Sequence, residues 1–160
     1  MYARRVPATD TERVVETADA PATRALGERL GRVAMPGDVI AVTGDLGAGK
    51  TELAKGFGAG LGVTEVVSSP SFVLMAEHPG RVPFFHLDLY RLDGPDQAVA
   101  GGLHDEREGD GVTLVEWAER LGDELPVGRL DVAIEIVAED RRRIVLRATD
   151  GRHRRYLEVA

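Results

Sequence analysis

One octapeptide limits the possible folds of this chain more than any other stretch: Gly44-Asp45-Leu46-Gly47-Ala48-Gly49-Lys50-Thr51. It matches G-x-x-x-x-G-K-[ST] at every fixed position, which is the pattern of loops that bind nucleotide phosphates. The pattern is informative only between a strand and a helix, and the flanking residues favour both. The apolar, β-branched run 39–42 is typical of a buried parallel strand, and residues 50–61 begin a helical pattern. The octapeptide, called the phosphate loop below, therefore predicts an α/β fold with a nucleotide site.

The residue types of the phosphate loop suit a polyphosphate ligand. Its three glycines allow the backbone to curl around a phosphate without Cβ clashes. Successive backbone N–H groups and the N-terminus of the following helix then form an anion site. Lys50 is expected to reach the β- and γ-phosphates, and the Thr51 hydroxyl to ligate magnesium. The residues expected to bind the nucleotide are Asp45, Leu46, Gly47, Ala48, Gly49, Lys50 and Thr51.

Length and charge restrict the class of protein. The 160 residues predict a single domain over 1–160, with residues 1–17 as a frayed, flexible arm that includes an edge strand. The net charge of −7 argues against a broad nucleic-acid-binding face, so we expect no DNA binding, and RNA contact only through a partner. There is no cysteine, no secretory signal and no apolar run near the roughly 18–20 residues of a membrane span. A cytoplasmic protein without membrane attachment is expected.

The order of patterns predicts the fold class. Early strands alternate with helices and late strands pair directly, which indicates a phosphate-loop NTPase-like α/β fold. We expect a mostly parallel central sheet, flanking helices and an antiparallel C-terminal hairpin. The first helix is expected to be capped by Asp19, with Pro21 in its first turn. The expected helices are 22–33, 50–61, 96–107 and 117–121, and the expected strands are 39–43, 72–75, 82–92, 112–115, 130–137, 143–148 and 156–159.

Hydrolysis needs more than a phosphate loop, because an acidic group must help to hold magnesium and another group must orient water. Two carboxylates close predicted strands, Asp88 and Glu116. Parallel strands would bring both to the mouth of the site. Each is also consistent with an ordinary solvated carboxylate at a strand end.

The chain resembles the bacterial TsaE (YjeE) family, the small ATPases needed to make threonylcarbamoyladenosine in tRNA. The resemblance runs from about residue 19 to residue 126 and rests on four segments in order. They are the phosphate loop, Ser69-Pro70-Ser71-Phe72, His86-Leu87-Asp88-Leu89-Tyr90-Arg91-Leu92 and Val115-Glu116-Trp117. The phosphate loop and the third segment together are highly specific.

The resemblance implies ATP and Mg²⁺ as ligands, with TsaD-like and TsaB-like proteins as partners that contact the tRNA. It implies that Thr51 and Glu116 help to bind magnesium and that Asp88 lies by the nucleotide. It also implies that the backbone around Ala20 lines the adenine side of the nucleotide pocket. The expected catalytic residues are Lys50, Asp88 and Glu116. ATPase activity is expected to be weak without partners. The chain departs from the family pattern at Glu52, whose charge is expected to weaken nucleotide binding.

Several assignments stay open. A small-molecule kinase shares the phosphate loop, although no Arg-rich lid or acceptor motif is evident, and a nucleotide-gated binding module without hydrolysis also fits. His86 is either a proton carrier or a hydrogen-bonded strand residue, and Arg91 either acts on the γ-phosphate or pairs at the surface. Trp117 either lines the pocket or packs in the core. The stretch 69–71 is either a nucleotide-sensing loop or a polar turn. Residues 141–143, all arginine, are interpreted as a solvated hairpin tip rather than an RNA contact.

Overall fold

A computed structural model describes residues 11–68, 75–91 and 109–160. The elements within these ranges follow one another along the chain. They are β1 (Glu12–Thr17), α1 (Ala20–Arg32), β2 (Val39–Gly44), α2 (Lys50–Gly60), β3 (Met75–His78), β4 (Phe84–Asp88), β5 (Val112–Glu116), the 3₁₀ helix η1 (Ala118–Glu124), β6 (Leu130–Ile136), β7 (Arg142–Ala148), the 3₁₀ turn η2 (Arg152–Arg154) and α5 (Arg155–Val159).

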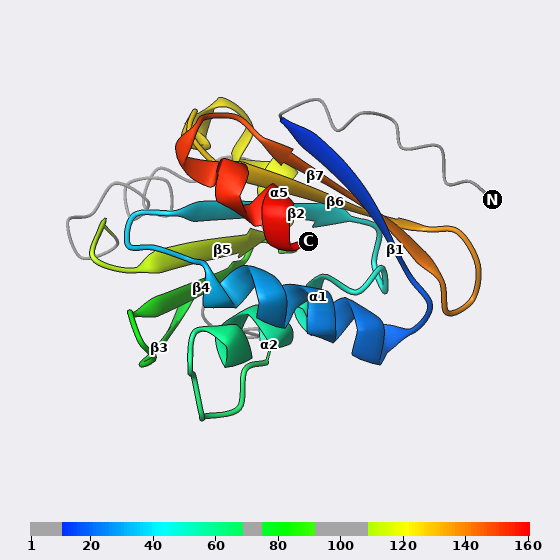
Figure 1. The fold of residues 1–160 in the computed structure, drawn as a ribbon, viewed down its shortest axis with the longest axis horizontal. Coiled ribbons are helices and arrows are strands. Elements are labelled where there is room, and N and C mark those ends of the chain that lie inside the picture. Colours follow the sequence, from blue (N-terminus) through cyan, green and yellow to red (C-terminus); the bar gives the residue numbers. More distant parts are fainter. Residues whose placement is uncertain (1–10, 69–74, 92–108) are drawn as a thin grey trace.

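One mixed sheet joins all seven described strands in the order β1-β7-β6-β2-β5-β4-β3 (Figure 1). The four central strands, β6, β2, β5 and β4, run parallel, whereas β1, β7 and β3 pair antiparallel at the two edges. The predicted edge strand near the N-terminus and the C-terminal hairpin are confirmed. The expected parallel arrangement holds for the four central strands, but the sheet as a whole is mixed, because the hairpin, β1 and β3 make half of the strand pairings antiparallel.

The two faces of the sheet carry cores of different size. The helices α1, α2 and α5 lie over one face (Figure 1), where Leu26, Phe57 and Tyr156 pack on inward-facing strand residues such as Ile40. On the opposite face, a smaller described cluster packs η1 residues such as Leu121 against strand residues of the opposite parity. This alternation between faces is what the period of 2 along a strand requires.

The helix pair α1 and α2 crosses at very short range because glycines face each other. A Cβ on Gly56 would lie 1.9 Å from the carbonyl oxygen of Arg24, and one on Gly60 would lie 2.2 Å from that of Glu28. On the other helix, a Cβ on Gly27 would lie 2.3 Å from the carbonyl oxygen of Leu53. Gly56 and Gly60, which disfavour a helix intrinsically, are therefore explained by close packing of the two backbones. Both glycines thus pack on α1.

Gly56→Ala is expected to destabilise the protein by about 1–3 kcal/mol, because the new methyl group overlaps main-chain atoms that cannot rotate away. Denaturant unfolding of the purified variant measures this change. Gly151→Ala is the matched control, since a Cβ there meets nothing within 4 Å and the backbone is already helical. Equal free energies of unfolding for the two variants would contradict the packing argument.

Other boundaries differ from the predictions. The stretch 156–159 is helical rather than extended, since it belongs to α5, where the adjacent residues Tyr156 and Leu157 are both buried. The strand expected over 82–92 is shorter and ends at Asp88. The predicted strand residues 72–74 and the helix 96–107 lie outside the described residues. Within the described ranges, no helix is both long and apolar enough to cross a bilayer.

Candidate functional site

The carboxyl ends of three parallel strands meet at one edge of the sheet. Glu116, the last residue of β5, pairs in register with Val42 of β2 on one side and with Asp88 of β4 on the other. The phosphate loop leaves β2 at this same edge. The structure thus brings together the loop and both predicted carboxylates, although they lie far apart in sequence.

The backbone of the phosphate loop has the strained conformations that its glycines allow. Gly47 and Gly49 have φ values of +81° and +111°, which residues with a Cβ rarely adopt. Gly49 is the N-cap of α2, and within the described structure no side chain caps this helix N-terminus. The first N–H groups of α2 are therefore available to an anion, which the positive end of the helix dipole also favours.

Lys50 is the cation of the site. Its side chain is only 5% exposed, and its Nζ donates to the carbonyl oxygens of Gly44 and Asp45 at 2.6 and 2.8 Å. The same Nζ lies 4.1 Å from the centroid of the Trp117 ring. Burial lowers the pKa of Lys50 from its ordinary value, although nearby carboxylates oppose the shift. These carboxylates are, in order of effect, Glu116, Glu119, Asp88 and Asp45.

The side-chain oxygens of Thr51 and Glu116 are in contact beside that cation. The Thr51 Oγ1 donates to Glu116 Oε1 at 2.9 Å, across 65 residues of sequence. The other carboxylate oxygen, Oε2, lies 2.5 Å from Nε2 of His86, which is fully buried. Because a carboxylate only accepts hydrogen bonds, His86 donates and holds the Glu116 side chain in place. His86 is therefore a hydrogen-bonded strand residue, and its partner belongs to the site.

This donor set fits magnesium rather than a softer metal. Mg²⁺ prefers oxygen ligands and is commonly held by one or two protein groups together with substrate phosphates. A hydroxyl and a carboxylate in contact beside the phosphate loop meet that requirement. Among the described residues, no group of three or more His, Cys, Asp or Glu side chains is arranged to hold a metal without such help.

Asp88 and Ala20 lie at the borders of the site. Asp88 is half-buried, and its Oδ1 accepts a hydrogen bond from the N–H of Tyr90 at 3.0 Å. Ala20 begins α1 just after its N-cap, Asp19, whose side chain accepts from the N–H of Ala22 as predicted. In the same first turn, Thr23 Cγ2 lies 3.6 Å from where a Cβ on Gly49 would be. The start of α1 therefore borders the phosphate loop.

Trp117 contributes to both the site and the core. It is half-buried and packs partly against the smaller core cluster. Its ring also contacts Lys50 and the exposed ring of Tyr90, whose centroid lies 5.0 Å away. Its left-handed backbone, with φ of +58°, turns the chain sharply after Glu116. Arg91 is exposed, and residues 69–71 lie outside the described residues.

Arg142 differs from its sequence interpretation, whereas the expected effect of Glu52 on nucleotide binding stays a prediction. Arg142, placed in a solvated hairpin tip, instead donates from Nε to the carbonyl oxygen of Ala48 at 2.9 Å and from Nη2 to that of Gly47 at 3.3 Å. Nothing in the local pattern distinguishes it from its two arginine neighbours.

Glu52 contacts Arg24 at 2.5 Å and Lys55 at 3.5 Å. Burial alone would raise the pKa of Glu52, but its hydrogen bond with Arg24 leaves it lowered.

Comparison with known proteins points to one family. The family model described as "Threonylcarbamoyl adenosine biosynthesis protein TsaE" matches residues 17–144. A Bacillus subtilis protein named "tRNA threonylcarbamoyladenosine biosynthesis protein TsaE" is 40% identical over 138 residues, which cover 86% of each chain. The Streptomyces coelicolor protein of the same name is 40% identical over 73% of this chain and 81% of its own. The crystal structure of Bacillus subtilis YdiB superposes with a TM-score of 0.79 at 36% identity, covering 92% of both chains.

Proposed function

The chain belongs to the TsaE family of threonylcarbamoyl adenosine biosynthesis proteins, and on that premise we propose that it is a magnesium-dependent ATPase serving this modification of tRNA. We propose that it acts with TsaD-like and TsaB-like partners, which carry the group transfer. The observation that carries the proposal is the contact between Thr51 and Glu116 beside Lys50, in which residues 65 positions apart meet at the start of α2.

The phosphates of ATP replace the contacts that Lys50 makes in the free protein. Its Nζ, bound to the carbonyl oxygens of Gly44 and Asp45, needs only a small movement to donate to the β- and γ-phosphates. The uncapped N–H groups at the start of α2 supply further donors. Because Lys50 is largely desolvated, each such hydrogen bond is stronger than it would be in water.

The charge of the site explains a magnesium requirement. Four carboxylates act on Lys50, so a bare triphosphate would meet net negative potential. Thr51 and Glu116 would hold the ion, and His86 keeps the Glu116 carboxylate oriented. When bound, magnesium would neutralise phosphate charge and fix the position of the phosphate oxygens.

Asp88 is the residue that we assign to the water or to coupling with a partner. It lies in register with Glu116, so its carboxylate projects from the same edge and the same face of the sheet. Water attacks the γ-phosphorus, the bond to the β-phosphate oxygen breaks, and ADP leaves with phosphate. Turnover would reset the partner complex, while the modification itself takes place on the partners.

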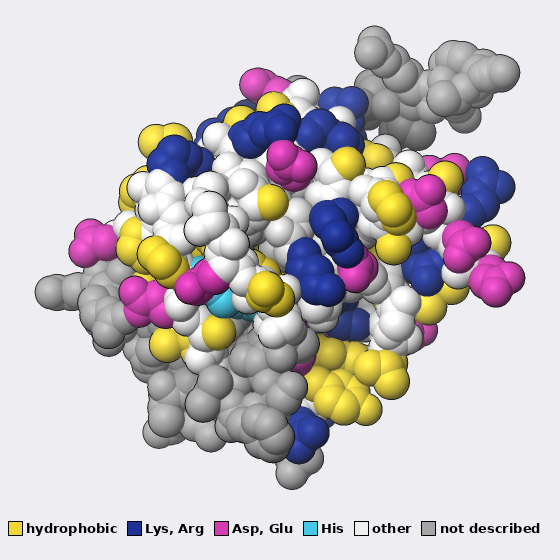
Figure 2. Space-filling view, turned by 90° about the horizontal axis from the view of Figure 1, so that it is seen from below, with side chains coloured by type: hydrophobic (Ala, Val, Ile, Leu, Met, Phe, Trp, Pro, Cys, Tyr) yellow, Lys and Arg dark blue, Asp and Glu magenta, His cyan; other side chains and the backbone are white. Residues whose placement is uncertain are grey.

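Charge distribution supports tRNA contact through partners rather than by this chain alone. The net charge is −7. On the face shown in Figure 2, Lys and Arg side chains are interspersed with acidic and apolar ones and form no continuous basic surface. Binding of a nucleic acid over a broad face depends on such a surface.

Glu116→Gln tests the proposed function. In the wild type, ATP with magnesium is expected to raise Tm and to be hydrolysed slowly, and faster when TsaD-like and TsaB-like partners are added. The variant keeps the shape of the side chain but loses the charge that holds the ion. Its affinity for ATP with magnesium is expected to fall about tenfold, with no loss of ATP binding in EDTA, where removing a negative charge reduces repulsion of the bare triphosphate. Calorimetric titration measures both affinities.

Glu119→Gln is the matched control, because Glu119 is exposed and acts on Lys50 through its charge without touching Thr51. It is expected to bind like the wild type with magnesium present. An equal loss in both variants would rule out a specific magnesium role for Glu116. A wild-type protein that ATP and magnesium do not stabilise would overturn the proposed function itself.

A further inference from the structure

The β6–β7 hairpin reaches the back of the phosphate loop. Gly44, which opens the loop, is paired in register with Ile134 of β6, and a Cβ on Gly44 would lie 2.7 Å from the carbonyl oxygen of Ile134. The loop after β2 and the turn between β6 and β7 therefore emerge at the same end of the sheet (Figure 1). A long side chain at the base of that turn can therefore reach the phosphate loop if it faces the loop.

Arg142, the first residue of β7, bridges the two segments with one guanidinium group. Toward the phosphate loop, it donates to the carbonyl oxygens of Ala48 and Gly47 at 2.9 and 3.3 Å. Toward the hairpin, its Nη1 donates to the carbonyl oxygens of Ala138, Glu139 and Arg141, each at 3.0 Å. All three nitrogens are thus used, and every acceptor is a main-chain oxygen.

We propose that Arg142 is a positioning residue that holds the phosphate loop in its nucleotide-binding shape; this inference rests on the proposed function. A loop that cradles an anion directs N–H groups inward, so its carbonyl oxygens must find donors on the outer side. Arg142 supplies those donors to two successive residues of the loop. It binds the outer side only, so it holds the loop without contacting phosphate.

The chemistry of the contact requires arginine. The guanidinium is planar, carries five N–H donors and stays charged at any pH the protein tolerates. Lysine offers one nitrogen and cannot reach the carbonyls of both segments at once. Arg142→Lys therefore keeps the charge but loses the bridge, and Arg142→Gln loses both.

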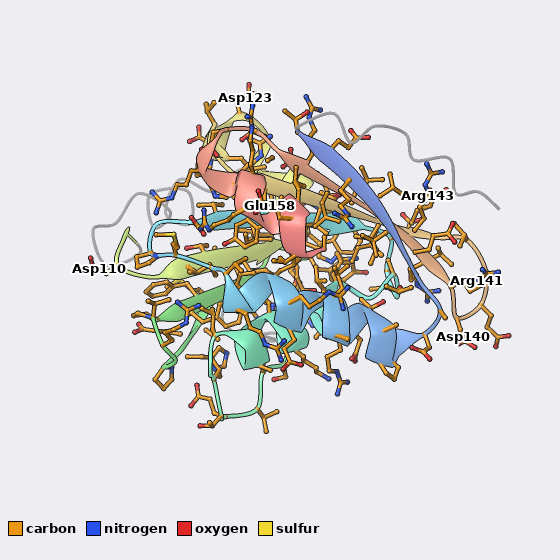
Figure 3. The ribbon with its side chains drawn as sticks, viewed as in Figure 1. Asp110, Asp123, Asp140, Arg141, Arg143 and Glu158 are labelled. Atoms are coloured by element: carbon orange, nitrogen blue, oxygen red, sulfur yellow. The ribbon has the colours of Figure 1, made fainter. Side chains whose placement is uncertain are left out.

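The neighbouring arginines provide matched controls. Arg141 and Arg143 are exposed, and Figure 3 shows them projecting outward along the hairpin together with Asp140. Arg143→Gln removes the same charge one residue away without touching the phosphate loop. A loss of ATP affinity caused by charge alone would therefore appear in Arg143→Gln as well.

The experiment compares the wild type, Arg142→Lys, Arg142→Gln and Arg143→Gln with two measurements. Calorimetric titration with ATP and magnesium gives the affinity, and amide hydrogen exchange of peptides covering residues 44–50 is followed without nucleotide. Both Arg142 variants are expected to bind ATP about tenfold more weakly and to exchange several-fold faster in the phosphate loop, with Arg143→Gln like the wild type. Exchange in peptides of α1 reports whether each variant is folded.

The two proposals fail in different ways. If both Arg142 variants keep wild-type affinity and wild-type exchange in the phosphate loop, or if Arg143→Gln is equally impaired, the positioning role is wrong. Slower folding or a lower Tm with unchanged affinity would also overturn it, because a merely structural hairpin contact predicts that result. If the wild type does not bind ATP, the proposed function fails. Faster amide hydrogen exchange in the phosphate loop of the Arg142 variants would still support the positioning role of Arg142.

Discussion

Lys50→Ala is expected to reduce ATP hydrolysis by about 10²- to 10³-fold, the loss typical when one preorganised charged donor is removed from a desolvated site. Lys50 is the buried cation of the phosphate loop, and four carboxylates surround it. Without it, the negative charge of these four carboxylates would face a triphosphate uncompensated by Lys50. ATP turnover measured with TsaD-like and TsaB-like partners, together with the content of threonylcarbamoyladenosine in tRNA, provides the test.

Lys55→Ala is the control for this variant. Lys55 lies one and a half turns further along α2, where it pairs at 3.5 Å with Glu52 in a half-exposed setting. Such pairs contribute between 0 and about 1 kcal/mol, so turnover is expected to remain close to that of the wild type. Unchanged hydrolysis and unchanged tRNA modification in Lys50→Ala would refute the nucleotide assignment.

Asp38→Ala is expected to have the largest effect on stability, at a place remote from the phosphate loop. Asp38 lies just before β2, its side chain is fully buried, and it accepts hydrogen bonds from Arg152 at 2.9 Å and from the Met35 N–H at 2.9 Å. It also accepts from Arg155 and from the hydroxyl of Tyr156. Burial and the nearby Asp38 charge raise the pKa of Tyr156 well above its ordinary value, so this hydroxyl stays a donor.

Removing one member of a buried charge network leaves the charges of its partners uncompensated, which lowers the free energy of unfolding by about 3–5 kcal/mol. We expect the lower end of that range for Asp38→Ala, because the side chain of Arg152 is 49% exposed and remains hydrated. For a chain of this size the corresponding loss in Tm is roughly 10 °C. Differential scanning calorimetry of the nucleotide-free protein measures it.

Asp131→Ala is the control for the Asp38 network. Asp131 also pairs with an arginine, Arg129 at 2.6 Å, but it is 34% exposed. Its removal is expected to cost at most about 1 kcal/mol. A similar Tm for the two variants would show that α5 and η2 are not held to the start of β2 by this carboxylate. Should Asp38→Ala not fold, Asp38→Asn keeps the side-chain volume and is measured instead.

The elements that the sequence predicts well are those governed by local chemistry. The cap at Asp19, the strand before the phosphate loop and the hairpin with its alternating pattern each depend on neighbouring residues. The stretch 156–159 was wrongly predicted as a strand because four alternating residues carry little information. Its helix depends on Asp38, more than a hundred residues away, which anchors Tyr156. Distant contacts of this kind leave no trace in the local pattern.

Some parts of the candidate site can likewise be predicted from local sequence and others cannot. The phosphate loop can be recognised from its eight residues, because positive φ angles and an inward-facing backbone depend on glycines at fixed positions. Asp88 and Glu116 were predicted from their positions at strand ends, but only the register of β2, β5 and β4 brings them to one edge. The bond from Arg142 to the loop was missed, since three successive arginines look alike until the hairpin is folded.

Residue types and their spacing are enough to predict the phosphate loop, the family and most of the helices and strands. The mixed sheet, the hydrogen bond between His86 and Glu116, and the contact of Arg142 rather than its neighbours with the phosphate loop become apparent in the folded chain alone. Hydrogen bonds act over about 3 Å in space, whereas residues such as Thr51 and Glu116, or Ala48 and Arg142, are 65 and 94 positions apart along the chain.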